Sequence, residues 1–292
     1  MFRGTGTALV TPFAEGRFDE ESFRRFIDFQ IEGGVEALIV LGTTGEAPSV
    51  SEEERTEIIS CAVATAAGRV PVIVGTGSNS TDHAVSSSLR AQDLGADGVL
   101  VVTPYYNKPT QEGLYRHFRE VAKAISIPMV IYNVPGRTGC NIHPDTVLRL
   151  ADLENVAGIK EASGDMAQVD DLIRRVKKVR SEFKVYSGND DQAFHLVCSG
   201  GDGVISVLSN VLPRETSTMI RSALDEDLPT ARKAHMKLSP MMKGLFVETN
   251  PIPVKYAVAR IGYCSQEIRL PLVPLSEKAR DGLDCLMDEL GL

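Results

Sequence analysis

The chain contains no tryptophan and has only five cysteines among its 292 residues. The cysteines are odd in number and scattered without a C-x-x-C spacing: Cys61, Cys140, Cys198, Cys264 and Cys285. This pattern argues against a disulfide framework and against a structural zinc site. We therefore expect reduced thiols, most of them buried, and no metal site.

Long hydrophobic runs are also missing. The longest apolar stretches, such as 37–41 and 98–102, have the length of strands, well short of the roughly 18 residues that a membrane-spanning helix needs. The N-terminal residues 1–13 carry one early arginine, a short apolar stretch and no small-residue cleavage pattern, which argues against a secretory signal. These features predict a soluble cytoplasmic protein without a membrane partner.

Positive charge is in deficit. Lysine and arginine total 31 against 39 acidic residues, which gives a formal net charge of −8. Nucleic acids and anionic membranes attract proteins with a positive surface field. The charge balance therefore excludes nucleic acid as the main partner.

What the sequence does contain is a regular alternation of short apolar runs and amphipathic segments. Several of the runs are continuously apolar, as in parallel strands covered on both faces. The predicted strands are 7–11, 37–41, 72–75, 98–102, 129–132, 156–160, 184–187 and 203–207. Eight such βα units predict an α/β fold of the (β/α)₈ TIM-barrel type.

Strand signals stop near Leu224. Three helical segments follow, at 230–246, 253–261 and 276–290, and prolines interrupt the stretches between them. We predict a catalytic barrel over residues 1–224 and a C-terminal helical domain over residues 225–292. No low-complexity linker separates them, so the extension should pack directly on the barrel.

Active sites of such barrels lie at the C-terminal ends of the strands. Lys160 closes the apolar run 156–159, so its amine should face a dry barrel mouth where desolvation lowers the pKa. A neutral amine there can attack a carbonyl and form a Schiff base. A structural ion pair with Glu161 or Glu46 is the alternative. Lys255, among the helical residues of the extension, is interpreted as structural.

Other strand ends supply polar partners. Tyr132 ends the preceding strand and could exchange protons beside Lys160, or be an ordinary buried tyrosine. Thr43 and Thr44, between glycines, could bind a small carboxylate or simply form a turn. Arg137, in a strand–helix loop, could hold a second carboxylate or remain a solvated charge.

Five motifs together resemble the dihydrodipicolinate synthase family over essentially the whole chain. They are Gly-Thr-Thr-Gly-Glu (42–46), Thr-Pro-Tyr-Tyr-Asn (103–107), Tyr-Asn-Val-Pro-Gly-Arg-Thr-Gly (132–139), Gly-Ile-Lys-Glu-Ala (158–162) and Asn-Pro-Ile-Pro-Val-Lys (250–255). The family has a (β/α)₈ barrel with a C-terminal helical extension. The resemblance implies condensation of pyruvate with L-aspartate-4-semialdehyde in lysine and diaminopimelate biosynthesis, without metal or organic cofactor.

The resemblance also implies residue roles. Lys160 matches the imine-forming lysine, Tyr132 the general acid/base, and Thr43 and Tyr106 its proton-relay partners. Tyr106 is expected to reach in from a neighbouring subunit of a homotetramer built from two tight dimers.

The remaining matches concern substrate binding. Thr44 matches the pyruvate carboxylate cradle, Ile205 lies where the family has a main-chain contact near pyruvate, and Arg137 matches the residue that receives the semialdehyde carboxylate. Two alternatives stay open. One is another pyruvate-dependent aldolase, of the N-acetylneuraminate or 2-keto-3-deoxygluconate type, although Arg137 favours a short second carboxylate. The other is a non-catalytic binding barrel.

Feedback control is where the sequence departs from the family pattern. Asn79 and Tyr105 match the effector site of lysine-inhibited members, but the positions of its histidines and glutamate are taken by Glu52, Arg55 and His83. A cationic ligand would meet Arg55 and lose an acidic partner. We therefore predict weak or absent inhibition by L-lysine.

Overall fold

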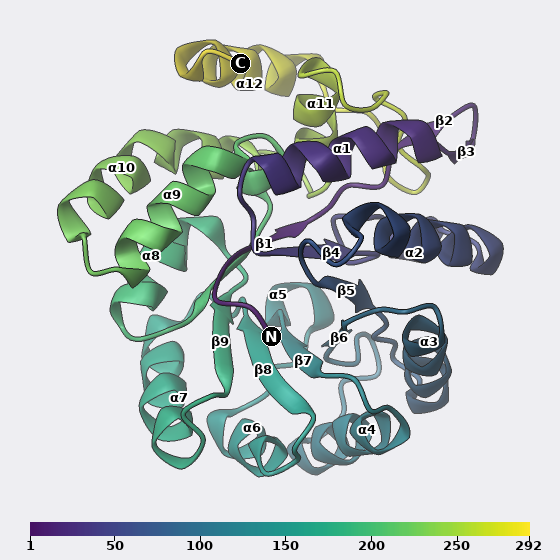
Figure 1. Cartoon of the computed structure of the whole chain (residues 1–292), viewed down its shortest axis with the longest axis vertical. Coiled ribbons are helices and arrows are strands. Elements are labelled where there is room, and N and C mark those ends of the chain that lie inside the picture. Colours follow the sequence, from purple (N-terminus) through teal and green to yellow (C-terminus); the bar gives the residue numbers. More distant parts are fainter.

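The computed structural model describes residues 1–292, in which eight parallel strands close into a barrel (Figure 1). The strands are β1 (Gly4–Ala8), β4 (Ala37–Val40), β5 (Val72–Gly75), β6 (Gly98–Val102), β7 (Met129–Asn133), β8 (Val156–Glu161), β9 (Lys184–Ser187) and β10 (Gly203–Ser206). Each strand pairs with the next along the chain, and β1 pairs with both β4 and β10. The barrel prediction is confirmed.

Helices surround the barrel as an outer layer (Figure 1). They are α1 (Glu20–Glu32), α2 (Glu52–Ala66), α3 (Thr81–Asp93), α4 (Gln111–Ala124), α6 (Pro144–Ala151), α7 (Met166–Val179), α8 (Asp190–Cys198) and α9 (Pro213–Leu224). The short helix α5 (Pro135–Thr138) lies inside this ring, over the end of the barrel, and the 3₁₀ turns are η1 (Ala47–Ser49) and η2 (Leu208–Asn210). The sequence sets some of their starts directly. Ser51 caps α2 in a reciprocal capping box with Glu54, as its position before three acids suggests.

The C-terminal extension consists of α10 (Leu228–Gly244), α11 (Ile252–Arg260) and α12 (Glu277–Leu290), each within two residues of its predicted start and end. One hydrophobic core runs from the barrel into these helices, from Leu9 to Met287. α10 packs against α8 and α9 of the barrel, and α12 packs on α10 and α11. The division into domains at residue 224 stays a prediction.

The first strand and one hairpin differ from the prediction. β1 is shifted toward the N-terminus from the expected 7–11, whereas the other seven strands match within one residue at each end. The ladder begins at small residues because β1 and β10 approach closely: a Cβ at Gly203 would lie 1.8 Å from the carbonyl oxygen of Gly4. A short hairpin, β2 (Phe13–Ala14) and β3 (Arg17–Phe18), was not expected.

The barrel interior is closed at its N-terminal end. Phe2 stacks on Tyr186 with a centroid distance of 4.4 Å, and the Tyr186 hydroxyl donates to the carbonyl oxygen of Phe2 at 2.7 Å. Small and branched side chains such as Ala8, Ile39 and Ile205 fill the layer above. The interior is therefore a packed core that leaves space only toward the other end.

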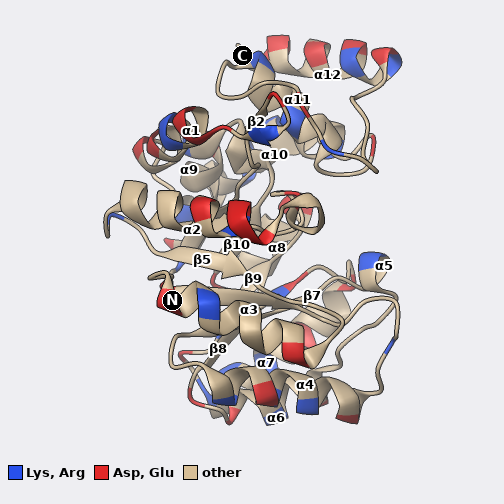
Figure 2. Cartoon of the chain, turned by 90° about the vertical axis from the view of Figure 1, so that its right-hand side faces the viewer, with Lys and Arg blue, Asp and Glu red and all other residues tan.

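Surface features bear on three further expectations. Charges of both signs are interspersed along the outer helices (Figure 2). No helix is long and apolar enough to cross a membrane, and the cytoplasmic location stays a prediction. All five cysteines are unpaired, but the expectation that most are buried is wrong: Cys61 and Cys140 are buried, whereas Cys198 and Cys285 are exposed.

Candidate active site

A cavity that is open to solvent lies at the C-terminal end of the barrel strands, with about 500 Å³ of empty space counted together with the solvent at its mouth. It is lined by five of the seven predicted site residues, namely Thr43, Thr44, Tyr132, Arg137 and Lys160, together with Ala8, Ile39, Gly42, Leu100, Val134, Ala162, Gly188, Asn189, Val207, Phe246 and Asn250. The barrel therefore gathers residues from several strand ends and from the extension around one space.

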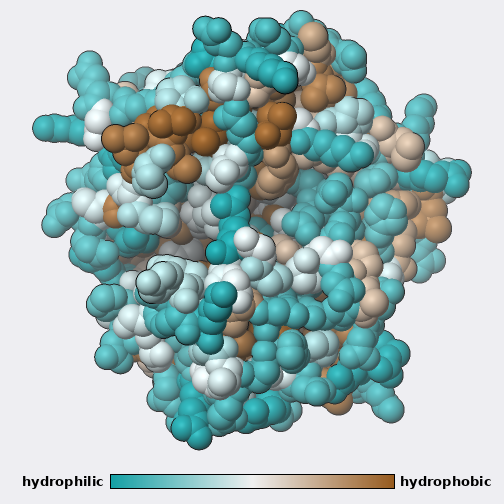
Figure 3. All heavy atoms as spheres, turned by 180° about the vertical axis from the view of Figure 1, so that it is seen from behind, coloured by the Kyte–Doolittle hydropathy of each residue, from teal (hydrophilic) through white to brown (hydrophobic).

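Figure 3 views the molecule from the side opposite Figure 1, where the mostly hydrophilic surface carries a hydrophobic area in its upper half.

Lys160 and Tyr132 are neighbours across two paired strands. Tyr132 on β7 is the register partner of Lys160 on β8. The amine nitrogen of Lys160 lies 4.4 Å from the centroid of the Tyr132 ring. The prediction that these residues lie side by side is confirmed.

The surroundings of Lys160 disfavour its charged form. The residue is 5% exposed, and burial lowers the pKa of its amine to about 8, against a partial rise from Asp190 and a further lowering by Arg137. No carboxylate forms an ion pair with it. The structural ion pair considered above is wrong: Glu46 pairs with Lys255 at 2.8 Å, and Glu161 accepts hydrogen bonds from Asn133. Lys160 is thus a buried amine without a counterion bonded to it.

Tyr132 is linked to the loop after β4. Burial raises the pKa of its phenol, while the charge of Arg137 and a hydrogen bond with Thr43 act in the opposite direction. Thr43 belongs to a tight turn in which the backbone N–H of Glu46 donates to the Thr43 carbonyl oxygen at 3.2 Å. Thr43, Tyr132 and Lys160 all line the same cavity.

Thr44 and Arg137 both contact one residue of the extension. The side-chain amide of Asn250 donates to the hydroxyl oxygen of Thr44 at 3.1 Å, and the guanidinium of Arg137, on α5, donates to the carbonyl oxygen of Asn250 at 3.2 Å. We assigned no role to Asn250 from the sequence. The motif 250–255 was its only signal, and nothing in that motif indicates that the extension reaches the barrel mouth.

Two predicted site residues lie outside the cavity. Ile205 is fully buried in the inner barrel core, two residues before Val207, which does line the cavity. Tyr106 is 89% exposed, in a loop where its φ is +73°, and its side chain is not part of the cavity wall.

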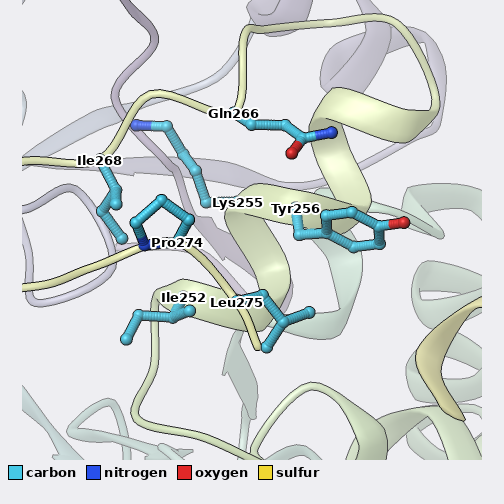
Figure 4. A pocket seen from close by; sticks show the side chains of 7 residues that line it. All are labelled: Ile252, Lys255, Tyr256, Gln266, Ile268, Pro274 and Leu275. Carbon is cyan, nitrogen blue, oxygen red and sulfur yellow. The ribbon is translucent and has the colours of Figure 1, made fainter. Parts of the chain in front are cut away.

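A second, smaller and shallow pocket lies in the extension (Figure 4). Lys255 is part of its wall, but the amine binds Glu46 and the carbonyl oxygen of Thr11. The Tyr256 hydroxyl, on another side of the cavity, is bound to Asp284. These contacts agree with the interpretation of Lys255 as structural, and the cavity presents no free reactive group.

Arg55 and Glu52, two of the residues at positions that match the family's lysine effector site, interact with neighbouring residues of the chain. Arg55 donates to the carbonyl oxygen of Ala47 at 2.9 Å and lies 3.5 Å from Glu52, which also pairs with Arg90. Weak or absent inhibition by L-lysine stays a prediction.

Fold and cavity together define a (β/α)₈-barrel enzyme with a buried lysine and tyrosine at its mouth. The Dihydrodipicolinate synthetase family matches residues 1–290, and the chain belongs to this family. It is 61% identical over 292 residues to the 4-hydroxy-tetrahydrodipicolinate synthase of Kosmotoga olearia, covering 100% of this chain and 99% of that protein.

Solved structures agree with this relationship. The crystal structure of dihydrodipicolinate synthase from Thermotoga maritima has a TM-score of 0.98 and 53% identity, with 100% of this chain and 99% of that chain covered. The chloride inhibited enzyme from Acinetobacter baumannii, solved in complex with pyruvate, has a TM-score of 0.96 and 41% identity, with 100% and 99% covered.

We expect Lys160 to react with small amine reagents at a lower pH than an exposed lysine. Because its pKa is lowered to about 8, the neutral, reactive amine should increase as the pH rises through about 8. Reductive methylation at graded pH, followed by peptide mass spectrometry, measures this, with exposed Lys123 as control. A midpoint near the ordinary 10.5 for Lys160 would contradict the dry site.

Proposed function

We propose that the chain condenses pyruvate with L-aspartate-4-semialdehyde, the 4-hydroxy-tetrahydrodipicolinate synthase reaction of lysine and diaminopimelate biosynthesis. The observation that carries this proposal is the Lys160 amine, buried without an ion pair beside Tyr132 and Thr43. Full-length relatives with this activity, at up to 61% identity, support it. The chemistry as proposed uses no metal and no organic cofactor.

The first half of the reaction activates pyruvate. The neutral amine of Lys160 attacks the ketone carbon, and loss of water leaves a protonated imine. This imine withdraws electrons, so a methyl proton can leave to give an enamine. Tyr132, beside Lys160, is proposed to carry the protons in these steps, with Thr43 as its relay partner.

The second half joins the two substrates. The enamine carbon attacks the aldehyde carbon of the semialdehyde, whose oxygen takes up a proton, and the imine is restored. The amino group of the semialdehyde then attacks the imine carbon and displaces Lys160, which closes the ring and frees the enzyme. The Lys160 amine is therefore the nucleophile in the first step of the reaction and the leaving group in the last.

Both substrates carry a carboxylate, and the cavity offers two places for one. Thr44 and the backbone of residues 43–44 are proposed to hold the pyruvate carboxylate near Lys160. Arg137 is proposed to receive the semialdehyde carboxylate, for which its planar fork of donors is suited. The backbone of Ile205, on β10, is proposed to contact pyruvate.

The proposed role of Tyr106 depends on the assembly of subunits. Its side chain points to solvent in the single chain, so its relay role requires the cavity of another subunit. We propose a homotetramer of two tight dimers, in which each Tyr106 completes the cavity of its partner. Large exposed hydrophobic residues outside the cavity, including Met236 and Leu270, are further support for subunit contacts.

Replacing Lys160 with alanine should abolish turnover, because the imine can no longer form. Product formation from pyruvate and the semialdehyde, coupled to a reductase that oxidises NADPH, measures the loss. Borohydride with pyruvate should add a reduced pyruvyl mass to the wild-type Lys160 peptide only. The same labelling in Lys160→Ala would contradict the assignment of Lys160 as the imine-forming residue. If the wild-type chain formed no adduct, the non-catalytic barrel would be favoured.

Arg137→Ala should raise the KM for the semialdehyde far more than that for pyruvate, by about 10- to 100-fold if a charge-assisted carboxylate contact is lost. Steady-state kinetics with each substrate varied in turn measures the ratio. Equal effects on the two KM values would count against this role and would favour a sugar-acid aldolase.

Two inactive variants should restore activity when they share a dimer. In a hybrid of Lys160→Ala and Tyr106→Ala chains, one cavity combines an intact Lys160 with an intact Tyr106 from its partner. Random pairing should recover about a quarter of the wild-type activity per chain, because the two-fold interface exchanges the same residue in both directions. Co-expression with separate affinity tags tests this. No recovery in purified hybrids would argue against a tyrosine acting across the interface.

A further inference from the structure

Asn250 belongs to the C-terminal extension, yet it forms part of the wall of the barrel cavity. It is 5% exposed, and it precedes α11 within the motif 250–255. The roles proposed above for the barrel residues leave this motif without a function. Asn250 is therefore a buried polar residue that a distant part of the chain brings to the site.

The contacts of Asn250 join the two groups proposed to bind carboxylates. Its side-chain Nδ2 donates to the hydroxyl oxygen of Thr44 at 3.1 Å. Its main-chain carbonyl oxygen accepts a hydrogen bond from Arg137 at 3.2 Å. Its side-chain Oδ1 is buried and accepts no hydrogen bond from the chain, which is unusual for a buried amide.

The direction of the first hydrogen bond matters for Thr44. A hydroxyl group has one proton to donate and can accept at its oxygen. Because the Thr44 oxygen accepts from Asn250, the Thr44 proton remains free for another acceptor. A carboxylate in the cavity is such an acceptor, and it would be repelled by an oxygen lone pair that pointed toward it.

We propose that Asn250 is a positioning residue that orients the Thr44 hydroxyl as a donor to the carboxylate of the first substrate. This inference rests on the proposed function, in which Thr44 binds pyruvate. It assigns the extension a direct part in substrate binding.

A second bridge holds the same two segments together. The amine of Lys255, five residues after Asn250, pairs with Glu46, two residues after Thr44. Both side chains are 1% exposed. The backbone N–H of Arg269 donates to the other carboxylate oxygen of Glu46 at 3.0 Å. The loop that carries Thr44 is thus clamped to the extension, which fixes the distance over which Asn250 reaches it.

The two links from Asn250 use different atoms, so a mutation can separate them. Asn250→Ala removes the side-chain link to Thr44 but keeps the main-chain carbonyl that binds Arg137. We expect the KM for pyruvate to rise about tenfold, as for loss of one buried hydrogen bond, while the KM for the semialdehyde changes less than about twofold. A smaller folded fraction would lower the apparent kcat and leave both KM values unchanged.

A double-mutant cycle tests whether Asn250 affects the KM for pyruvate through the Thr44 hydroxyl. Thr44→Val removes the hydroxyl that Asn250 orients, so adding Asn250→Ala to it should raise the KM for pyruvate little further. Steady-state kinetics on the wild-type chain, both single variants and the double variant measure this. The thermal unfolding midpoint of each variant shows whether it is folded.

Asn250→Asp is the isosteric companion, needed if the alanine variant does not fold. Its carboxylate would draw the Thr44 proton toward itself and repel the substrate carboxylate, so the KM for pyruvate should rise at least as much as with alanine. Equal rises for both substrates with Asn250→Ala, additive effects with Thr44→Val, or a wild-type KM for pyruvate in Asn250→Asp would each overturn the inference. A wild-type chain that neither turns over nor traps pyruvate would instead overturn the proposed function, and this inference with it.

Discussion

A lysine amine acts as a nucleophile only while it is unprotonated, and the site depends on keeping Lys160 in that state. The barrel does so by burying the lysine, which is 5% exposed. Asp190 is the carboxylate whose charge favours the protonated form, and it accepts hydrogen bonds from the Ser206 hydroxyl and from the backbone N–H groups of Val207 and Leu208. Asp190 is therefore bound by other donors and forms no ion pair with the Lys160 nitrogen.

The barrel topology explains why the proposed catalytic pair could be predicted from the sequence. Parallel strands that follow one another in a barrel end at the same edge, so Tyr132 and Lys160 had to be neighbours once their apolar runs were recognised as strands. The polar segments after β4 and β7, which carry Thr44 and Arg137, converge for the same reason. Periodicity and strand order are local signals, and they were enough for this part of the site.

Periodicity and strand order could not predict the contacts that arise from tertiary packing. Asn250 reaches the cavity because the extension folds back over the barrel, and no spacing in the sequence encodes that path. The start of β1 was misplaced because the close approach of Gly4 and Gly203 selects glycines in place of the apolar residues that identify other strands. Tyr106 lies outside the cavity of its own chain, so a single chain gives no account of its role.

The stacked rings of Phe2 and Tyr186 restrict access to the barrel interior to one end. Because they close the N-terminal end, a molecule that reaches Lys160 must enter and leave by the strand ends above it. In the proposed reaction, the substrate that bonds to the lysine would therefore lie deepest, and the second would bind above it. The closed N-terminal end thus makes the order of substrate binding a consequence of the barrel's shape.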